Sequence, residues 1–422
     1  MRSRNFRLLL ACDVTNGIGS AVATVAIPFA VLAIGGTAAD VGWVATAALV
    51  PMIAFLLLGG VAGDRFARHK VMMAANATQG AAQTVAAILM LTGTARIWEL
   101  LVLAAVRGMG LGFYYPASQG LLPQTVPEKD RAQANALART GRNGAGITGA
   151  SLGGILVGLA GPGWGLAVDA ISFAIATALR AGMRFPALPA ARGESTLHQL
   201  RVGWREFLAR RWLWVIVLTF TLMTAVTSGT INVLGPVVAD AQLGGARSWG
   251  LILASYGLGA VLGGLVMMRY RPQRMLLVAM TAAGIFAILL FALAVPLAVP
   301  LIMAAALLVG LSSEVFMVNW VTTMQQEIPH DLMSRLSSFD AFGSFALAPV
   351  GVAVAGPLAT SFGTSPVLVA GGLVIVGVTL AVLLVPEVRQ MRRRAPTVSP
   401  ADGAADQASS AAAEKLAASG VD

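Results

Sequence analysis

Residues 59–66, Gly-Gly-Val-Ala-Gly-Asp-Arg-Phe, recur in similar form as Gly-Gly-Leu-Val-Met-Met-Arg-Tyr at residues 263–270. A second pair keeps nearly the same spacing, because Gln-Thr-Val-Pro at residues 124–127 parallels Gln-Glu-Ile-Pro at residues 326–329. All four stretches lie where a long apolar segment ends. A shared spacing at several such boundaries indicates that the chain consists of two repeated halves.

The segments between these motifs are apolar enough to span a membrane. Of the 422 residues, 57% are hydrophobic and only 11% are charged, whereas soluble domains carry about 25% charged residues. A spanning helix needs about 20 mostly apolar residues. Runs of that length end near Gly35, Asp64, Gly93, Gly120, Gly161, Arg184, Asp240, Arg269, Pro296, Gln325, Gly363 and Pro386. The sequence therefore predicts an all-α membrane protein with twelve transmembrane helices in two pseudo-symmetric six-helix bundles.

The predicted domain boundaries follow from where the polar residues gather. Residues 1–184 form the N-terminal bundle, residues 185–211 a cytoplasmic interdomain loop, residues 212–386 the C-terminal bundle and residues 387–422 a disordered cytoplasmic tail. With the N-terminus in the cytoplasm, 24 of the 29 Lys and Arg residues fall on the cytoplasmic side and only 2 on the other. This bias matches the positive-inside rule and places both termini in the cytoplasm.

The same distribution excludes several classes of protein. The net charge of +10 belongs to the membrane edges, so we expect no nucleic-acid partner. The three histidines, at positions 69, 198 and 330, all fall in predicted loops, and the chain carries no zinc-protease or Walker motif. We therefore expect no enzyme activity, no ATP hydrolysis, no cofactor and no bound metal.

Several motifs resemble the major facilitator superfamily, and the resemblance covers about residues 1–390. Residues 60–70 resemble the family's signature between its second and third helices, and residues 107–112 resemble the fourth-helix motif of proton-coupled drug antiporters. Residues 149–154 resemble the fifth-helix exporter motif, with Ala150 in place of its proline. Further similarity, at residues 115–127, 203–207 and 326–329, is to the macrolide and siderophore exporter branch. The resemblance implies a monomer in a bacterial-type inner membrane.

Charges inside a membrane are functional candidates because they are costly there. Arg107 lies in the fourth predicted helix and Glu314 in the tenth, which are equivalent in the repeat and line the cavity of the family fold. We expect Glu314 to carry the proton with Arg107 as its charge partner; the alternative is a static ion pair that holds the bundles together. Asp13 is a candidate second titrating group beside Arg139 or Arg142. Asp169 is expected to be a cap or surface group near the outer interface.

The loop after the second helix carries a predicted conformational latch. The resemblance implies that the Asp64 carboxylate accepts hydrogen bonds from the positive N-terminus of the eleventh helix. Arg65, Arg68 and Lys70 would then pair with nearby carboxylates. The alternative is that this loop is only a basic topology signal.

Small residues recur every four positions in the fifth helix. Gly149, Gly153 and Gly154 belong to two such ridges. Small residues let helix backbones approach closely in lipid, so we expect a tightly packed, sliding interface here.

Polar and aromatic side chains on the helices expected to line the cavity indicate the class of substrate. Many weak contacts suit a large amphipathic compound. The candidate cavity residues are Asn16, Ser20, Tyr114, Tyr115, Thr227, Asn319 and Trp320.

Together these features predict a secondary active transporter that exports a small amphipathic compound, of the drug, macrolide-like or siderophore-like kind. Proton antiport and alternating access would drive export, so the expected partners are the substrate, protons and the lipid bilayer. Fold does not determine direction, which leaves an importer or uniporter as the alternative. A non-transporting membrane assembly or sensor protein is the remaining one.

Overall fold

The computed structural model describes residues 3–119, 121–127, 130–183, 204–295 and 297–393, and all regular structure in these ranges is helical. The elements of the N-terminal half are α1 (Arg4–Ala33), α2 (Ala38–Arg65), α3 (Arg68–Leu91), α4 (Ile97–Gln119), η1 (Leu122–Gln124), α5 (Arg131–Ala160) and α6 (Pro162–Ala181). Residues 204–209 form a short helix. The elements of the C-terminal half are α8 (Arg211–Gly229), η3 (Thr230–Leu234), α9 (Gly235–Gln242), α10 (Ala246–Arg269), α11 (Met275–Gly284), α12 (Phe286–Ala294), α13 (Val299–Glu327), α14 (His330–Phe345), α15 (Ala348–Phe362), α16 (Thr364–Leu383) and α17 (Pro386–Gln390).

These elements confirm the predicted pattern of six long helices in each half of the described chain. Three of the C-terminal crossings are interrupted, because α8 continues through the π-helical turn η3 into α9, α11 into α12, and α14 into α15. Within the described residues, eleven helical stretches are long and apolar enough to cross a membrane. The twelfth, α3, falls short because it carries Asn76, Gln79 and Gln83, which are buried inside the N-terminal bundle.

Local chemistry sets the helix ends at the predicted places. Thr37 and Asp40 form a capping box at the start of α2, with the Asp40 carboxylate 2.8 Å from the Thr37 backbone nitrogen. Gly161 and Gly363 occupy equivalent places in the two halves, between α5 and α6 and between α15 and α16. Both have a positive backbone angle φ, 89° and 87°, which residues other than glycine rarely adopt. The repeat is therefore visible in the turns as well as in the helices.

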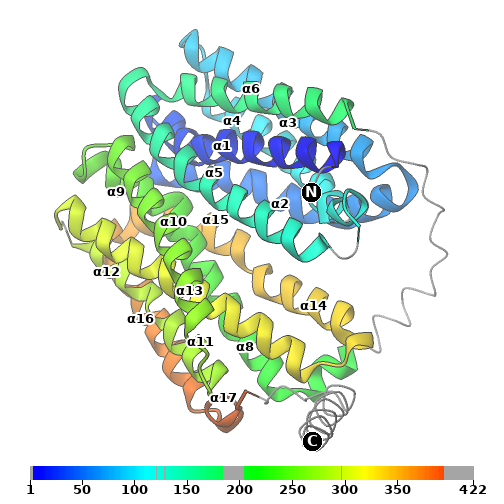
Figure 1. The fold of residues 1–422 in the computed structure, drawn as a ribbon. Helices are drawn as coiled ribbons and strands as arrows, with labels where there is room; N and C mark the ends of the chain where they lie inside the picture. Colours follow the sequence, from blue (N-terminus) through cyan, green and yellow to red (C-terminus); the bar gives the residue numbers. More distant parts are fainter. Residues whose placement is uncertain (1–2, 120, 128–129, 184–203, 296, 394–422) are drawn as a thin grey trace, which may run out of the picture.

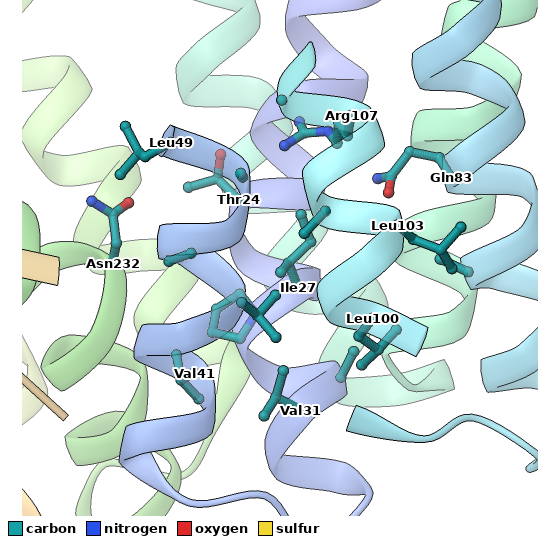
Figure 2. A pocket seen from close by; sticks show the side chains of 18 of the residues that line it. Thr24, Ile27, Val31, Val41, Leu49, Gln83, Leu100, Leu103, Arg107 and Asn232 are labelled. Atoms are coloured by element: carbon teal, nitrogen blue, oxygen red, sulfur yellow. The ribbon is translucent and has the colours of Figure 1, made fainter. Parts of the chain in front are cut away.

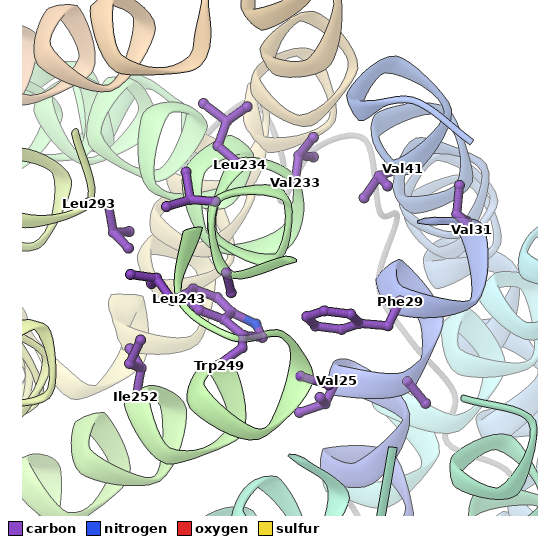
Figure 3. Packing of buried hydrophobic residues seen from close by; sticks show 14 of the residues in the cluster. Val25, Phe29, Val31, Val41, Val233, Leu234, Leu243, Trp249, Ile252 and Leu293 are labelled. Atoms are coloured by element: carbon purple, nitrogen blue, oxygen red, sulfur yellow. The ribbon is translucent and has the colours of Figure 1, made fainter. Parts of the chain in front are cut away.

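The buried hydrophobic residues show that the two bundles share a core at one end only. One cluster joins Phe29 of α1 to Trp249 of α10, and Figure 3 shows these two side chains facing each other across the interface. A second cluster lies within residues 207–388 and a third within residues 6–183. The third cluster contains the first turns of α1, whereas the shared cluster contains the later turns of the same helix. The two bundles therefore join at the end away from the N-terminus and have separate cores near the N-terminus (Figure 1).

Equivalent glycines make equivalent contacts in the two halves. Gly149 of α5 lies against the α1 backbone, and Gly351 of α15 lies against the α8 backbone. Gly154 lies against α10 of the other bundle, and Gly356 against the start of α2. The bundles are thus clamped at the shared end by α5 on α10 and α15 on α2, as a two-fold pseudo-symmetric pair.

Candidate functional site

Glu314 of α13 and Arg139 of α5 form an ion pair that joins the two bundles. The Glu314 side chain is 15% exposed and the Arg139 side chain 52% exposed. Gly263 and Gly264 of α10 lie beside the Glu314 side chain. The expected pairing of Glu314 with Arg107 is wrong in this conformation, because the arginine that reaches Glu314 comes from α5.

The ion pair lies toward the open end of the α5–α10 interface. These helices contact at Gly158 and Arg247, then at Gly154 and Gly250, and then at Ile147 and Gly257. Arg139 is two further turns along α5 from Ile147, and the rise of about 1.5 Å per residue places it roughly 12 Å beyond that contact. The pair therefore joins the bundles well beyond the Ile147–Gly257 contact, on the side away from the shared core.

Arg107 instead belongs to a buried cluster within the N-terminal bundle. Its guanidinium lies 3.8 Å from the carboxylate of Asp169 on α6, which also accepts a 2.6 Å hydrogen bond from the Gln83 amide of α3. Asp169 is completely buried, so the prediction of a surface or capping group is wrong. The signal that was missed is the polar character of α3, which supplies the amide donor.

A cavity of about 250 Å³ adjoins this cluster. It lies between α1, α2, α3, α4 and α6, and its lining is mostly apolar, with Arg107, Gln83 and Thr24 as polar groups. Figure 2 shows Asn232 on the side of the cavity opposite Arg107 and Gln83. Asn232 belongs to the π-helical turn η3, and such turns often occur at functional sites.

A third polar cluster surrounds Asp13 on α1. Its carboxylate lies 3.6 Å from Arg142 of α5 and 3.4 Å from Arg180 of α6. Arg180 also donates a 2.8 Å hydrogen bond to the Tyr114 hydroxyl and lies over the Tyr114 ring, 5.1 Å from its centroid. The expected neighbour Arg142 is present. Arg180, however, is fully buried in α6, although it is one of the 24 Lys and Arg residues that the sequence predicts to lie on the cytoplasmic side.

The residues predicted to line the substrate cavity lie in different parts of the structure. Trp320 lines a second cavity, in the C-terminal bundle, and Tyr114 is held by Arg180. Asn319 is fully buried and donates to the Val315 carbonyl of its own helix, so its expected place in the cavity wall is wrong. Tyr115 is 55% exposed. Partly exposed positions are found for Asn16, Ser20 and Thr227.

The predicted latch stays a prediction. The side chains of Asp64 and Arg65 lie outside the described residues, although the α2 backbone ends at Arg65 as expected. Arg68 engages a partner and Lys70 is exposed at the start of α3. No cluster of His, Cys, Asp and Glu suited to a metal ion occurs among the described residues.

The glycine ridges of α5 face two different helices. Gly149 and Gly153 lie against α1 inside the N-terminal bundle, whereas Gly154 lies against α10 across the bundle interface. Of the three glycines, only Gly154 lies at the interface between the bundles. The sliding role expected of this helix stays a prediction.

Comparisons with known proteins match most of the chain to one family of transporters. Residues 9–352 match the family model of the Major Facilitator Superfamily. The chain is 25% identical over 397 residues to the multidrug efflux pump Tap of Mycolicibacterium fortuitum, a match that covers 91% of this chain and 96% of Tap. It is 27% identical over 389 residues to the enterobactin exporter EntS of Escherichia coli O157:H7, covering 90% of this chain and 91% of EntS.

Solved structures share the fold. The nucleoside transporter NupG superposes with a TM-score of 0.71 at 13% identity, over 91% of this chain and 99% of NupG. A bacterial homologue of the human lysosomal transporter Spinster, in an inward-facing and unoccupied conformation, gives a TM-score of 0.64 at 16% identity, over 94% of this chain and all of the other.

Proposed function

The chain belongs to the major facilitator superfamily, and we propose that this membrane transporter exports a small amphipathic compound in exchange for protons. Two full-length relatives, Tap and EntS, are a multidrug efflux pump and an enterobactin exporter. They support export rather than import. They also support a transporter over an enzyme or a non-transporting assembly.

The observation that carries the proton step is the Arg139–Glu314 ion pair. It couples a titratable carboxylate of one bundle to a cation of the other, on the side where the bundles are apart. Protonation of Glu314 removes its charge and with it the attraction to Arg139. The relative free energies of the two bundle arrangements then depend on whether Glu314 holds a proton.

The cycle follows from this dependence. With the N-terminus in the cytoplasm, the described conformation opens inward, and the Arg139–Glu314 pair corresponds to the state after proton release. Substrate enters from the cytoplasm, the bundles rock about the central site, and the opposite opening exposes Glu314 to protons from outside. Proton entry thereby drives substrate exit. Asp13, held between Arg142 and Arg180, is the candidate second titrating group.

The test is Glu314→Gln in inside-loaded proteoliposomes under an imposed pH gradient, with a fluorescent amphipathic compound chosen from a susceptibility screen of a deletion strain. We expect gradient-driven efflux to fall at least tenfold while counterflow persists, because counterflow needs no net proton transfer. The matched control is Glu206→Gln, which breaks the Arg210–Glu206 pair outside the spanning helices.

A neutral pair separates a proton carrier from a static bridge. Combining Arg139→Gln with Glu314→Gln places two amides that hydrogen-bond at the same positions and leaves no titratable group there. If the pair only holds the bundles together, the double variant keeps pH-driven efflux. If Glu314 carries the proton, it does not, and survival of pH-driven efflux in Glu314→Gln alone would contradict the proposal.

A further inference from the structure

Four carboxylates lie inside the helices α1, α6, α13 and α14, away from the ends of those helices, and one of them has no arginine partner among the described residues. Asp13, Asp169 and Glu314 each face at least one guanidinium. Asp340 of α14 instead accepts hydrogen bonds from two neutral groups, the Trp320 indole at 3.1 Å and the Ser344 hydroxyl at 3.5 Å. Within the described part of the chain this half-buried carboxylate is paired with neutral donors only, so a bound cation would stabilise its negative charge.

This carboxylate borders a cavity of about 340 Å³ between α8, α13 and α14. That volume is within the range of small-molecule sites, ~300–1,000 Å³. Part of its lining, Ile216, Phe316, Trp320 and Met324, belongs to the core that the C-terminal bundle does not share with its neighbour. The cavity is therefore located in the half of the protein where the bundles are apart.

Aromatic rings form one wall of the same cavity. Phe220 and Phe316 stack with ring centroids 4.2 Å apart and planes inclined by 15°. Trp320 continues the stack from Phe316 at 6.3 Å and 14°. Stacked faces of this kind attract flat aromatic groups and organic cations.

We propose that this cavity is a binding site for a lipophilic organic cation with aromatic substituents, whose positive charge lies against Asp340 and whose rings pack on Phe220, Phe316 and Trp320. The site rests on the proposed function in that it names a substrate class for the transporter. It is distinct from the Arg139–Glu314 pair, so charge recognition and proton coupling use different carboxylates. An anionic compound of the same shape meets the carboxylate and is rejected.

Two ions of nearly identical shape test the charge preference. Equilibrium dialysis of the purified full chain is performed with radiolabelled tetraphenylphosphonium, a cation, and with tetraphenylborate, an anion. We expect the cation to bind at least tenfold more tightly than the anion. Asp340→Asn should weaken cation binding at least tenfold and leave anion binding unchanged, whereas Asp340→Glu should retain the preference.

The matched control is Asp240→Asn, which removes an exposed carboxylate from α9 of the same bundle and should change neither affinity. Thermal unfolding and size-exclusion profiles report whether each variant is folded. Should Asp340→Asn not fold, Ser337→Arg supplies a guanidinium one turn away in the same cavity and should block the cation while Asp340 stays in place.

Equal affinity for the two ions, or undiminished cation binding in both Asp340→Asn and Ser337→Arg, overturns the site. The binding assay uses no pH gradient, so it is independent of proton coupling. Cation binding at Asp340 without pH-driven efflux removes the antiport proposal and keeps the site. Proton-driven efflux of a neutral amphiphile without any cation preference removes the site alone.

Discussion

Replacing Gly154 with alanine should shift the protein away from the described conformation. A Cβ atom at Gly154 would lie 2.8 Å from the Ala246 carbonyl oxygen and 2.8 Å from the Gly250 Cα atom. Optimal contacts between carbon atoms are ~3.5–4.0 Å, so α5 and α10 must separate by roughly 0.7 Å to admit one methyl group. Under the proposed alternating access, both contacts exist only while this end of the bundle interface is closed.

The expected magnitude follows from the cost of overpacking. Inserting a methyl group into a close-packed contact costs about 1–3 kcal/mol. Because the cost falls on one of the two states, the population ratio should change by about 5- to 150-fold. The transporter should then spend more time open at the end where Phe29 faces Trp249.

Electron–electron distance measurements can record this shift. Nitroxide labels at Leu159→Cys of α5 and Gln242→Cys of α9 occupy exposed positions on the two bundles, while the native Cys12 is fully buried. We expect Gly154→Ala to raise the long-distance population. The control is Gly146→Ala on the same helix, where an added Cβ meets nothing within 4 Å. An unchanged distribution in Gly154→Ala, or an equal shift in the control, would refute the packing argument.

Three further variants test other contacts. Asp13→Asn leaves the buried Arg180 without its carboxylate and should destabilise the N-terminal bundle by about 3–5 kcal/mol; a thermal midpoint equal to that of the parent protein would show that the ion pair contributes nothing. Gly149→Leu forces a side chain against the α1 backbone, so it should lower the thermal midpoint rather than redistribute the two states in the distance measurement. Asp64→Asn should reduce transport and change the balance of inward and outward accessibility, and no change in either removes the latch.

The positions of the spanning segments could be predicted because they depend on local chemistry. Hydrophobic length, glycine and proline set where each helix ends, and the ends at Ala33, Ala160 and Phe362 lie within three residues of the predicted boundaries. Sequence similarity between the halves likewise predicts pseudo-symmetry, and Gly154 and Gly356 occupy matching interfaces. Family membership followed from motifs of the same local kind.

The charge pairs could not be predicted in the same way. A sequence position gives the depth of a side chain along its helix, at about 1.5 Å per residue, but its direction depends on how the helix is rotated against its neighbours. Arg107 and Glu314 were expected to meet because their helices are equivalent in the repeat. Packing turns Arg107 toward Asp169 and brings Arg139 to Glu314.

The sequence by itself thus determined the number of helices, the repeat and the family, because apolar length and turn chemistry act locally. Only the tertiary structure decided that the bundles meet at one end, that Arg180 is buried, and that Asp340 faces an aromatic cavity whose described lining holds no arginine. Each of these depends on side chains from helices that are far apart in the chain. Their proximity depends on the rotation of each helix and on which end of the bundle interface is closed.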